Sequence, residues 1–432
     1  MAIVSKGKTR DNEYAESGMG FQSINRREMF VGMKNVVFLS PNHPANYWHF
    51  CYELKQNGLR VLGIGDAPYD SLRQELKESL HEYYRVESLE NYEEVYRAVA
   101  YFIHRYGTID WLESNNDDYA ERDARLRTAY CITSGLQEEE VARIRSKSGV
   151  KEIFQQAGIQ VARWHMVDDF KHCAAFIREV GYPVVVKADC GMRSDDTRKL
   201  HNDEELKAFL ESREPEEKYL LEELVHGELV SYDAVIDASG EPIFETGNVT
   251  PFTGMMTAKE KDNAIYYAHG ELPGDTREAG RAAVKHIGIR SRFVHLAFFR
   301  LTQDHPGLGK KGKLVALEAT MGTAGGYWLD MINFANGTDV YKIWADMIAF
   351  GESQRCAQQR GYCAFVGRRD GKRFIISHER LMRKYRENLR MVQRVPEELT
   401  GLMANQMYVA VFETKEEMDA FCADALWCEN VA

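Results

Sequence analysis

The sequence predicts a multidomain protein of mixed α/β and α+β class: a doubly wound α/β domain, a small α+β lid and a larger mixed-sheet base. With 432 residues, the chain exceeds one ordinary hydrophobic core, so roughly two or three domains are expected. Its first third alternates short apolar runs with helical patterns, which is typical of a parallel sheet. Further on, Asp237-Ala-Ser-Gly240 separates two apolar runs and predicts a β-hairpin.

The composition indicates a folded, acidic protein. At 44% hydrophobic and 11% aromatic residues, the chain has enough apolar surface to bury a sizeable core. The net charge of −11 argues against a nucleic-acid partner, because such binding depends on phosphate neutralisation by Lys and Arg. No apolar run approaches the roughly 20 residues of a membrane helix, and the first residues lack the apolar stretch of a signal peptide. The 8 cysteines contain no CxxC pair, so reduced thiols in a cytoplasmic protein are expected.

The first part of the chain is predicted to hold a polar arm and the α/β domain. Residues 1–30 form the arm, which we expect to be loosely ordered or packed on a partner. Residues 31–140 form the domain that precedes the lid. Its expected elements are strands at 35–39, 61–64 and 109–113 and helices at 45–57 and 91–106. No GxGxxG motif follows the first strand, so dinucleotide binding there has little support.

Three further segments complete the predicted organisation: the lid at 141–228, the base at 229–351 and a C-terminal β/α extension at 352–432. The lid is expected to contain helices at 148–157 and 169–180 and strands at 163–167 and 183–187. The base is expected to contain strands at 229–236, 242–246, 293–299 and 314–318 and a helix at 275–287. In the extension, which we interpret as an appended module, strands are expected at 362–366 and 406–412. Thr414 and Glu417 predict a capping box for the last helix.

Two lysines stand where they could contact phosphate groups. Lys187 ends the apolar run PVVV and is followed by Ala-Asp-Cys190-Gly191, a strand that opens into a loop. An ammonium group at a strand end can donate to a phosphate oxygen while backbone amides of the loop donate to others. Lys147 lies before a helix that ends in QQAGIQV. Taken alone, each lysine is more often a solvated surface group.

The segment from Tyr219 to Glu228 alternates apolar and acidic residues. Adenine needs one acceptor for its amino group and backbone groups for its ring nitrogens, inside an apolar slot, and an extended segment supplies all of these. The ordinary interpretation is an edge strand with solvated acids.

Taken together, the phrases RSKSGVKEIFQQAGIQVARW and PVVVKADCG, with the later glutamates, resemble the ATP-grasp superfamily, including L-amino acid ligases and proteins of the biotin carboxylase and carbamoyl phosphate synthase type. The resemblance implies that Lys147 and Lys187 contact the phosphates of ATP. It assigns Glu222, with Glu223 beside it, and the backbone of Leu224 to the adenine. It assigns Glu228 to the ribose.

The metal-binding part departs from this pattern. Family members carry a carboxylate on one strand, often as HxE, and ExN followed by an arginine on the next. The corresponding segments here are His295-Leu-Ala297 and Glu318-Ala-Thr320-Met-Gly322. If the strands pair, Ala297 takes the place of the first metal carboxylate and Thr320 that of the asparagine, so Glu318 is the one usual Mg²⁺ ligand left. Gly322 stands where the arginine belongs. Period two puts Leu314, Ala316 and Glu318 on one face of their strand.

Several neighbouring residues have weaker assignments. Gly325 and Gly326 resemble the family's glycine loop beside the acceptor substrate, and His295 could face that site, although a lone histidine on an apolar strand is more often a core residue. Asp304 and Asp330 are candidate replacement ligands, with a surface or cap role as the alternative. A nucleophilic role for Cys190 lacks a partner histidine.

The resemblance implies an ATP- and Mg²⁺-dependent carboxylate–amine ligase that forms an amide or peptide bond through an acyl phosphate. Its substrates would be a small-molecule carboxylate and an amine such as an amino acid, and a homodimer is left open. The alternative is a nucleotide-binding ATP-grasp pseudoenzyme with a regulatory or scaffold role, which the residues at 297, 320 and 322 favour. A second alternative is the same chemistry on a peptide side chain.

Overall fold

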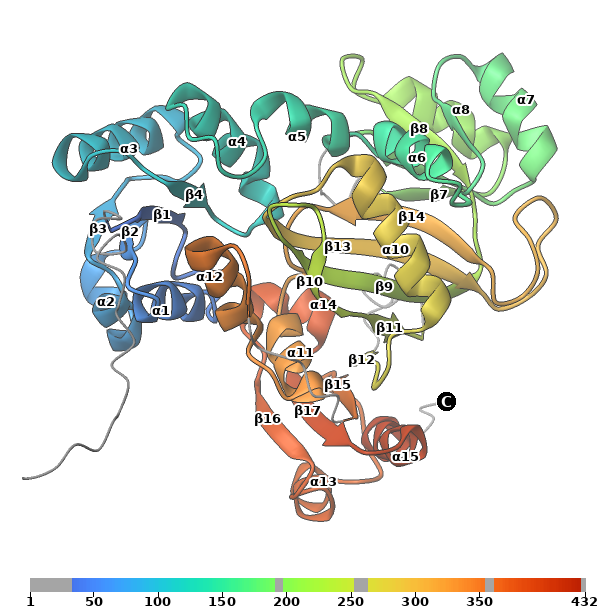
Figure 1. The fold of residues 1–432 in the computed structure, drawn as a ribbon. Helices are drawn as coiled ribbons and strands as arrows, with labels where there is room; N and C mark the ends of the chain where they lie inside the picture. Colours follow the sequence, from blue (N-terminus) through green and yellow to red (C-terminus); the bar gives the residue numbers. More distant parts are fainter. Residues whose placement is uncertain (1–32, 191–196, 252–262, 354–360, 429–432) are drawn as a thin grey trace, which may run out of the picture. The chain divides into compact units, whose positions relative to one another are not determined.

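The computed structural model describes residues 33–190, 197–251, 263–353 and 361–428 (Figure 1). The predicted arm at 1–30 and most of the loop after Cys190 lie outside these ranges. Residues from Lys34 onward cluster into one compact unit. Within the described ranges, none of the helices has the length and hydropathy needed to cross a membrane.

The first domain is built on a 4-stranded parallel sheet in the order β3-β2-β1-β4. β1 (Asn35–Leu39), β2 (Arg60–Gly65) and β4 (Trp111–Glu113) are the predicted strands, and β3 (Glu82–Arg85) was not predicted. The helices are α1 (Trp48–Gln56), α2 (Gln74–Ser79), α3 (Tyr92–Tyr106), α4 (Ala120–Ala129) and α5 (Glu138–Arg145). α1 and α3 pack on opposite faces of this sheet, so the doubly wound prediction is confirmed.

Local chemistry explains where α3 begins and ends. The Asn91 side chain accepts a hydrogen bond from the backbone N–H of Glu94, which caps the first turn. The helix ends at Gly107, whose φ of +86° is a conformation that favours glycine. Between these ends, Val95, Val99 and Phe102 recur at helical spacing and are fully buried against the sheet.

The lid has its own 4-stranded antiparallel sheet in the order β5-β8-β6-β7. Its strands are β5 (Trp164–Met166), β6 (Val184–Ala188), β7 (Arg198–Leu200) and β8 (Tyr219–Glu223). α7 (Phe170–Val180) and α8 (Asp203–Ser212) cover one face and form a separate apolar core with it. Because β8 pairs with both β5 and β6, the interpretation of this segment as an edge strand is wrong.

The base is part of a 9-stranded sheet. It contains β9 (Gly227–Ile236), β10 (Pro242–Thr246), β11 (Asn248–Thr250), β12 (Ala264–Ala268), β13 (Arg292–Leu301) and β14 (Leu314–Thr320). β9 and β10 form the predicted hairpin. α6 (Lys147–Gln156) and α10 (Gly274–Ile287) pack on one face, and α11 (Trp328–Asn336) and α12 (Val340–Phe350) contribute to the core on the other.

The base sheet differs from the prediction of a mixed sheet. All of the strand pairs described for it are antiparallel, and a single parallel bridge joins Val161 to Ala316 at β14. The mixture of parallel and antiparallel pairing therefore lies between the sheets of the protein rather than within the base.

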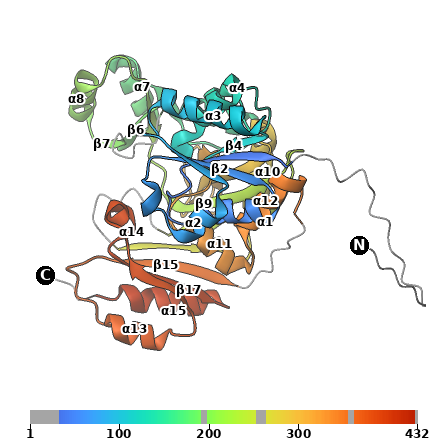
Figure 2. The ribbon, with the colours of Figure 1, turned by 90° about the vertical axis from the view of Figure 1, so that its left-hand side faces the viewer.

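The C-terminal segment continues the base sheet. β15 (Tyr362–Arg368) pairs with β12, and β17 (Gln406–Phe412) and β16 (Leu389–Arg394) follow in the order β12-β15-β17-β16. The C-terminal β/α extension is therefore not a separate module, because backbone hydrogen bonds join it to the base. Figure 2 shows α13 (His378–Lys384) and α15 (Lys415–Leu426) alongside these strands, and the capping box at Thr414 and Glu417 is confirmed.

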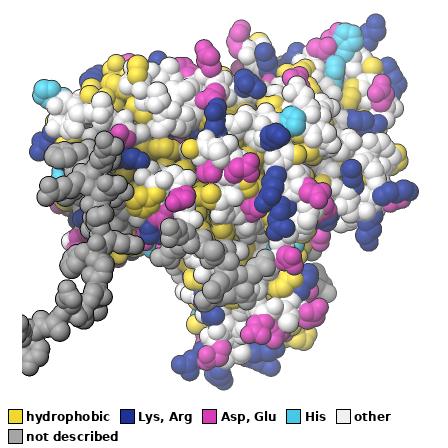
Figure 3. All heavy atoms as spheres, in the orientation of Figure 1, with side chains coloured by type: hydrophobic (Ala, Val, Ile, Leu, Met, Phe, Trp, Pro, Cys, Tyr) yellow, Lys and Arg dark blue, Asp and Glu magenta, His cyan; other side chains and the backbone are white. Residues whose placement is uncertain are grey.

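The surface in view carries both signs of charge. Figure 3 shows Lys, Arg, Asp and Glu side chains interspersed across the face that it presents, in keeping with a chain of 55 basic and 66 acidic residues. Interspersed charges favour solubility over polyanion binding.

Candidate active site

Two residues of the lid sheet form a buried ion pair. Lys187 on β6 and Glu222 on β8 belong to neighbouring strands, and Lys187 Nζ lies 2.9 Å from Glu222 Oε2. Burial lowers the pKa of Lys187, but the Glu222 carboxylate outweighs this effect and the pKa is raised. Lys187 is therefore held as a cation.

Lys147 lies at the start of α6, where the Ser146 side chain caps the helix by accepting from Gly149 N. Its Nζ donates to the backbone oxygen of Ala188, at 2.8 Å, and its backbone N–H donates to Asp189 O. Burial and the positive charge of Lys187 lower the pKa of Lys147. The negative charge of Glu318 acts in the opposite direction on both lysines. Lys147, Lys187 and Glu318 are thus close enough to act on one another electrostatically.

A third lysine, which the sequence interpretation missed, completes the lid cluster. Lys151 on α6 is 1% exposed, and its Nζ lies 2.9 Å from Glu222 Oε1. Burial raises the pKa of Glu222, but Lys187 and Lys151 outweigh it and hold the pKa at about 2. The helical spacing of Lys151, four residues after Lys147, was the available signal, because i and i+4 share a helix face.

Glu223 follows Glu222 on β8, so its side chain lies on the opposite face of the lid sheet. Its carboxylate accepts from the Nε and Nη2 groups of Arg163, at 3.0 and 2.7 Å, and from the backbone N–H of Arg163. This bidentate pairing ties β8 to the start of β5. Leu224 follows half-buried at the hinge, and Val225 packs into a small apolar cluster with Phe299 and Val315 of the base.

Glu228 lies on the face of the base sheet opposite to Glu318. Alternation along β9 puts Glu228 on the face of Val230 and Tyr232, which pack under α10, and its cross-strand neighbour is Arg300. The Glu318 side chain lies on the opposite face of the sheet. This placement does not support the ribose contact that the resemblance implied.

The predicted metal strands pair. β13 and β14 are antiparallel, with Ala297 directly opposite Glu318 and His295 opposite Thr320. Period two, however, placed Glu318 with Leu314 and Ala316, and this is wrong. A bulge at Leu317 shifts the register, so Glu318 turns to the face of His295 and Ala297. Glu318 is exposed, whereas Ala297 is 2% exposed.

His295 is held by an aspartate from the neighbouring strand. His295 Nδ1 lies 2.7 Å from Asp233 Oδ1 on β9, and the same carboxylate accepts from Ser231 Oγ and Trp328 Nε1. Burial lowers the pKa of His295, but Asp233 outweighs it and the pKa is raised. Asp233 was missed in the sequence, where period two along β9 was the only signal.

The sequence matches no protein-family model and no curated protein. Several solved structures, however, are similar to this chain. The chain is similar to the L-amino acid ligase from Bacillus licheniformis, with a TM-score of 0.66 and 15% identity over 92% of this chain and 98% of that one. It is similar to phosphoribosylglycinamide synthetase from Anaerococcus prevotii, with a TM-score of 0.63 and 15% identity over 90% and 96% of the two chains.

A third similar structure is the biotin carboxylase domain of the Hydrogenobacter thermophilus 2-oxoglutarate carboxylase, in complex with MgADP, ADP and bicarbonate. The TM-score is 0.64 and the identity 16%, over 91% of this chain and 89% of that one. These proteins share one architecture across nearly all of the chain. The chain has the ATP-grasp fold.

Within the ATP-grasp fold, the end of β14 is packed against the first domain. A Cβ atom at Gly322 would lie 3.3 Å from the backbone oxygen of Asn115, which is a tight contact. Met321 N donates to Asp117 Oδ1, and Thr323 Oγ1 lies 2.8 Å from Tyr47 OH. Gly322 therefore lies at a close approach between the end of β14 and the first domain.

The glycine loop and the two candidate aspartates have separate surroundings. Gly326 has a φ of +69°, a conformation that favours glycine, while Gly325 is exposed. Asp304 forms a surface ion pair with Lys310 at 2.8 Å. Asp330 accepts from Asn46 Nδ2 at 2.9 Å. Asp304 therefore has the surface role that was the alternative to metal binding, whereas Asp330 is half-buried and burial raises its pKa, so its assignment stays open.

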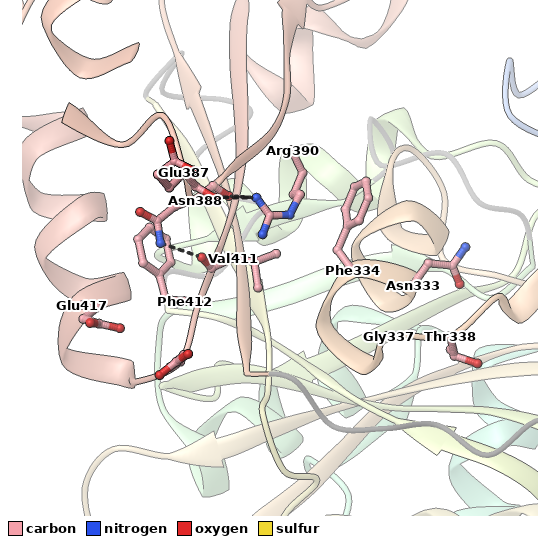
Figure 4. A pocket seen from close by; sticks show the side chains of 11 residues that line it. Asn333, Phe334, Gly337, Thr338, Glu387, Asn388, Arg390, Val411, Phe412 and Glu417 are labelled. Carbon is pink, nitrogen blue, oxygen red and sulfur yellow. Dashed lines mark hydrogen bonds between the residues drawn. The ribbon is translucent and has the colours of Figure 1, made fainter. Parts of the chain in front are cut away.

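A cavity of about 800 Å³ lies elsewhere, between the end of α11 and the strands and helix of the C-terminal segment (Figure 4). None of the predicted site residues lines it. Arg390 there donates to the backbone oxygens of Glu387 and Asn388, and its walls carry three glutamates and one arginine. Its lining is Asn333, Phe334, Gly337, Thr338, Glu387, Asn388, Arg390, Val411, Phe412, Glu413 and Glu417.

Proposed function

We propose that this protein is an ATP-dependent carboxylate–amine ligase that forms an amide or peptide bond through an acyl phosphate. The observation that supports the proposal is that Lys147 and Lys187 act on each other electrostatically and that the charge of Glu318 acts on both. Two ammonium groups facing one exposed carboxylate suit a nucleotide phosphate chain with its metal ion. The similarity to ATP-dependent ligases supports the same proposal.

The residues present fit a Mg²⁺ ion carried by the nucleotide. Magnesium in nucleotide sites is commonly held by one or two carboxylates, with phosphates and water supplying the other ligands. Glu318 is exposed and would be the protein carboxylate. When bound, the ion would neutralise charge on the phosphates during transfer.

The proposed reaction has two steps. A substrate carboxylate oxygen attacks the γ-phosphorus and the bond to the β-phosphate oxygen breaks, which releases ADP and leaves an acyl phosphate. The amine nitrogen then attacks the acyl carbon, the bond from carbon to phosphate oxygen breaks, and inorganic phosphate leaves as the amine loses a proton. Lys147 and Lys187 would hold the phosphates throughout, and the backbone of Leu224 would contact the adenine. His295, fixed by Asp233, would face the reacting groups.

A second candidate is a nucleotide-binding ATP-grasp protein with a regulatory or scaffold role. The specific observation in its favour is Ala297, which faces Glu318 across the strand pair where a second carboxylate would complete the metal site. The loss of a hard anionic ligand is expected to slow phosphoryl transfer by orders of magnitude.

One experiment separates the two candidates. ADP and phosphate release is measured with ATP, Mg²⁺ and a pooled set of amino acids, beside equilibrium binding of ATP. Turnover that requires both Mg²⁺ and the amino-acid pool supports the ligase. ATP binding without turnover supports the regulatory protein, and an absence of ATP binding contradicts both.

A further inference from the structure

The buried Lys151 lies beside the candidate nucleotide site but does not line it. Its side chain is 1% exposed on α6, whereas the Lys187 side chain is 13% exposed. Both lysines pair with the same carboxylate: Lys151 with Glu222 Oε1 and Lys187 with Glu222 Oε2, each at 2.9 Å. Of the two, only Lys187 has surface that a ligand could contact.

This arrangement gives Lys187 two competing demands. The proposed function requires its ammonium group to donate to a nucleotide phosphate, while Glu222 holds the same group inside the lid. A buried carboxylate that loses its cation is strongly destabilised, so a lone Glu222–Lys187 pair would resist any movement of the lysine. With Lys151 in place, Glu222 keeps a cation when Lys187 turns outward.

We propose that Lys151 is a positioning residue that neutralises Glu222 and thereby frees Lys187 to bind the nucleotide phosphates. The inference rests on the proposed nucleotide site and deepens it. Lys151 itself contacts no substrate. It lies one helical turn after Lys147, so α6 supplies one lysine to the phosphates and one to the carboxylate behind them.

The test uses three variants of the full chain and isothermal titration with MgADP, beside circular dichroism to confirm folding. Lys151→Met is expected to weaken MgADP binding about 10-fold or more, because Lys187 is then the sole cation of Glu222. Lys151→Arg is expected to bind within about 3-fold of the unaltered chain. Lys151→Met with Glu222→Gln is expected to recover most of the loss, because the neutral amide needs no cation and still offers an acceptor.

A matched control and a second readout distinguish positioning from packing. Lys171→Met changes an exposed lysine on α7 of the same lid and is expected to leave binding unchanged. The effect of Lys151→Met is also expected to shrink from ADP to adenosine, which lacks the phosphates. A packing defect would weaken both ligands equally and would not respond to Glu222→Gln.

The outcomes are distinct. Normal MgADP binding by a folded Lys151→Met variant, or failure of the double variant to recover, overturns the inference and leaves the nucleotide site standing. If Lys151→Met does not fold, the Lys151→Arg and double variants decide, since weak binding by both overturns the inference. If the unaltered chain binds no MgADP, the proposed function and this inference fall together.

Discussion

The two sides of the candidate site differ in how their charges are held. On the lid side, Glu222 is buried between Lys151 and Lys187, so its charge is part of the folded core. On the base side, Glu318 is exposed and faces Ala297 across the strand pair. Removing one of the lid lysines leaves the buried Glu222 carboxylate without a partner. Replacing Glu318 removes an exposed charge and leaves no buried charge unpaired. The proposed nucleotide half is therefore coupled to folding, whereas the exposed Glu318 of the proposed metal half can be replaced without loss of core packing.

The largest effect is expected from the base side, where the comparison predicts loss of chemistry without loss of structure. Glu318→Gln should reduce Mg²⁺-dependent ADP release by roughly 1000-fold or more, because it removes the carboxylate that is proposed to hold the metal. The melting temperature should be unchanged. Glu278→Gln, an exposed position on α10, is the control. Residual turnover within about 10-fold of the unaltered chain would mean that Glu318 does not hold the metal.

On the lid side, a substitution should change both the ATP affinity and the melting temperature. Lys187→Met is expected to weaken ATP binding about 100-fold, or roughly 3 kcal/mol, because a charge-assisted hydrogen bond to phosphate is lost. It should also lower the melting temperature, since Glu222 keeps only Lys151. Titration calorimetry and thermal unfolding measure the two effects, with Lys171→Met as the control. Unchanged ATP affinity would place the phosphates elsewhere.

The elements of the fold that depend on local sequence patterns could be predicted from the sequence. Strand β1, helix α3 and the capping box at Thr414 follow from hydrophobic periodicity and cap chemistry within a few residues. The short strands β11 and β16 have weak patterns and were missed. The pairing of β15 with β12, which joins the last segment to the base, is a long-range contact that no local pattern encodes.

The same limit applies within the site. Lys147 and Lys187 were found because they end or begin recognisable elements. Lys151 and Asp233 act through partners on other elements, Glu222 and His295, and a single sequence does not register those elements against one another. The bulge at Leu317 shows the point most directly, because one extra residue reverses the face on which Glu318 lies.

Acid titration sharpens the claim that the lid charges belong to the core. The pKa of Glu222 is lowered from 4.5 to about 2 in the folded protein, so its contribution to stability is complete above pH 4.5 and lost as the pH falls towards 2. The contribution is on the order of 3 kcal/mol. Urea unfolding of the unaltered chain between about pH 5.5 and 2.5 should show this loss. In the Glu222→Gln variant, the free energy of unfolding should depend less on pH over this range. An equally steep loss in that variant would contradict a buried ionised Glu222.

The smallest effect is expected from a variant that adds a second carboxylate to the proposed metal site. It tests whether this carboxylate is all that the site lacks. Ala297→Glu places a second carboxylate opposite Glu318, and in the presence of nucleotide it should tighten Mg²⁺ binding about 10-fold, since a hard anionic ligand is added at hydrogen-bonding range of the first. Ala297→Gln has the same size without the charge and should show no gain. Because Ala297 is buried, both variants should lose similar stability, so the difference between them isolates the ligand from the packing. A gain in Mg²⁺ affinity with a parallel gain in turnover would mean that residue 297 alone limits the chemistry. Tighter Mg²⁺ binding without turnover would mean that a second departure from the family pattern, such as Gly322 in place of the arginine, also limits the chemistry.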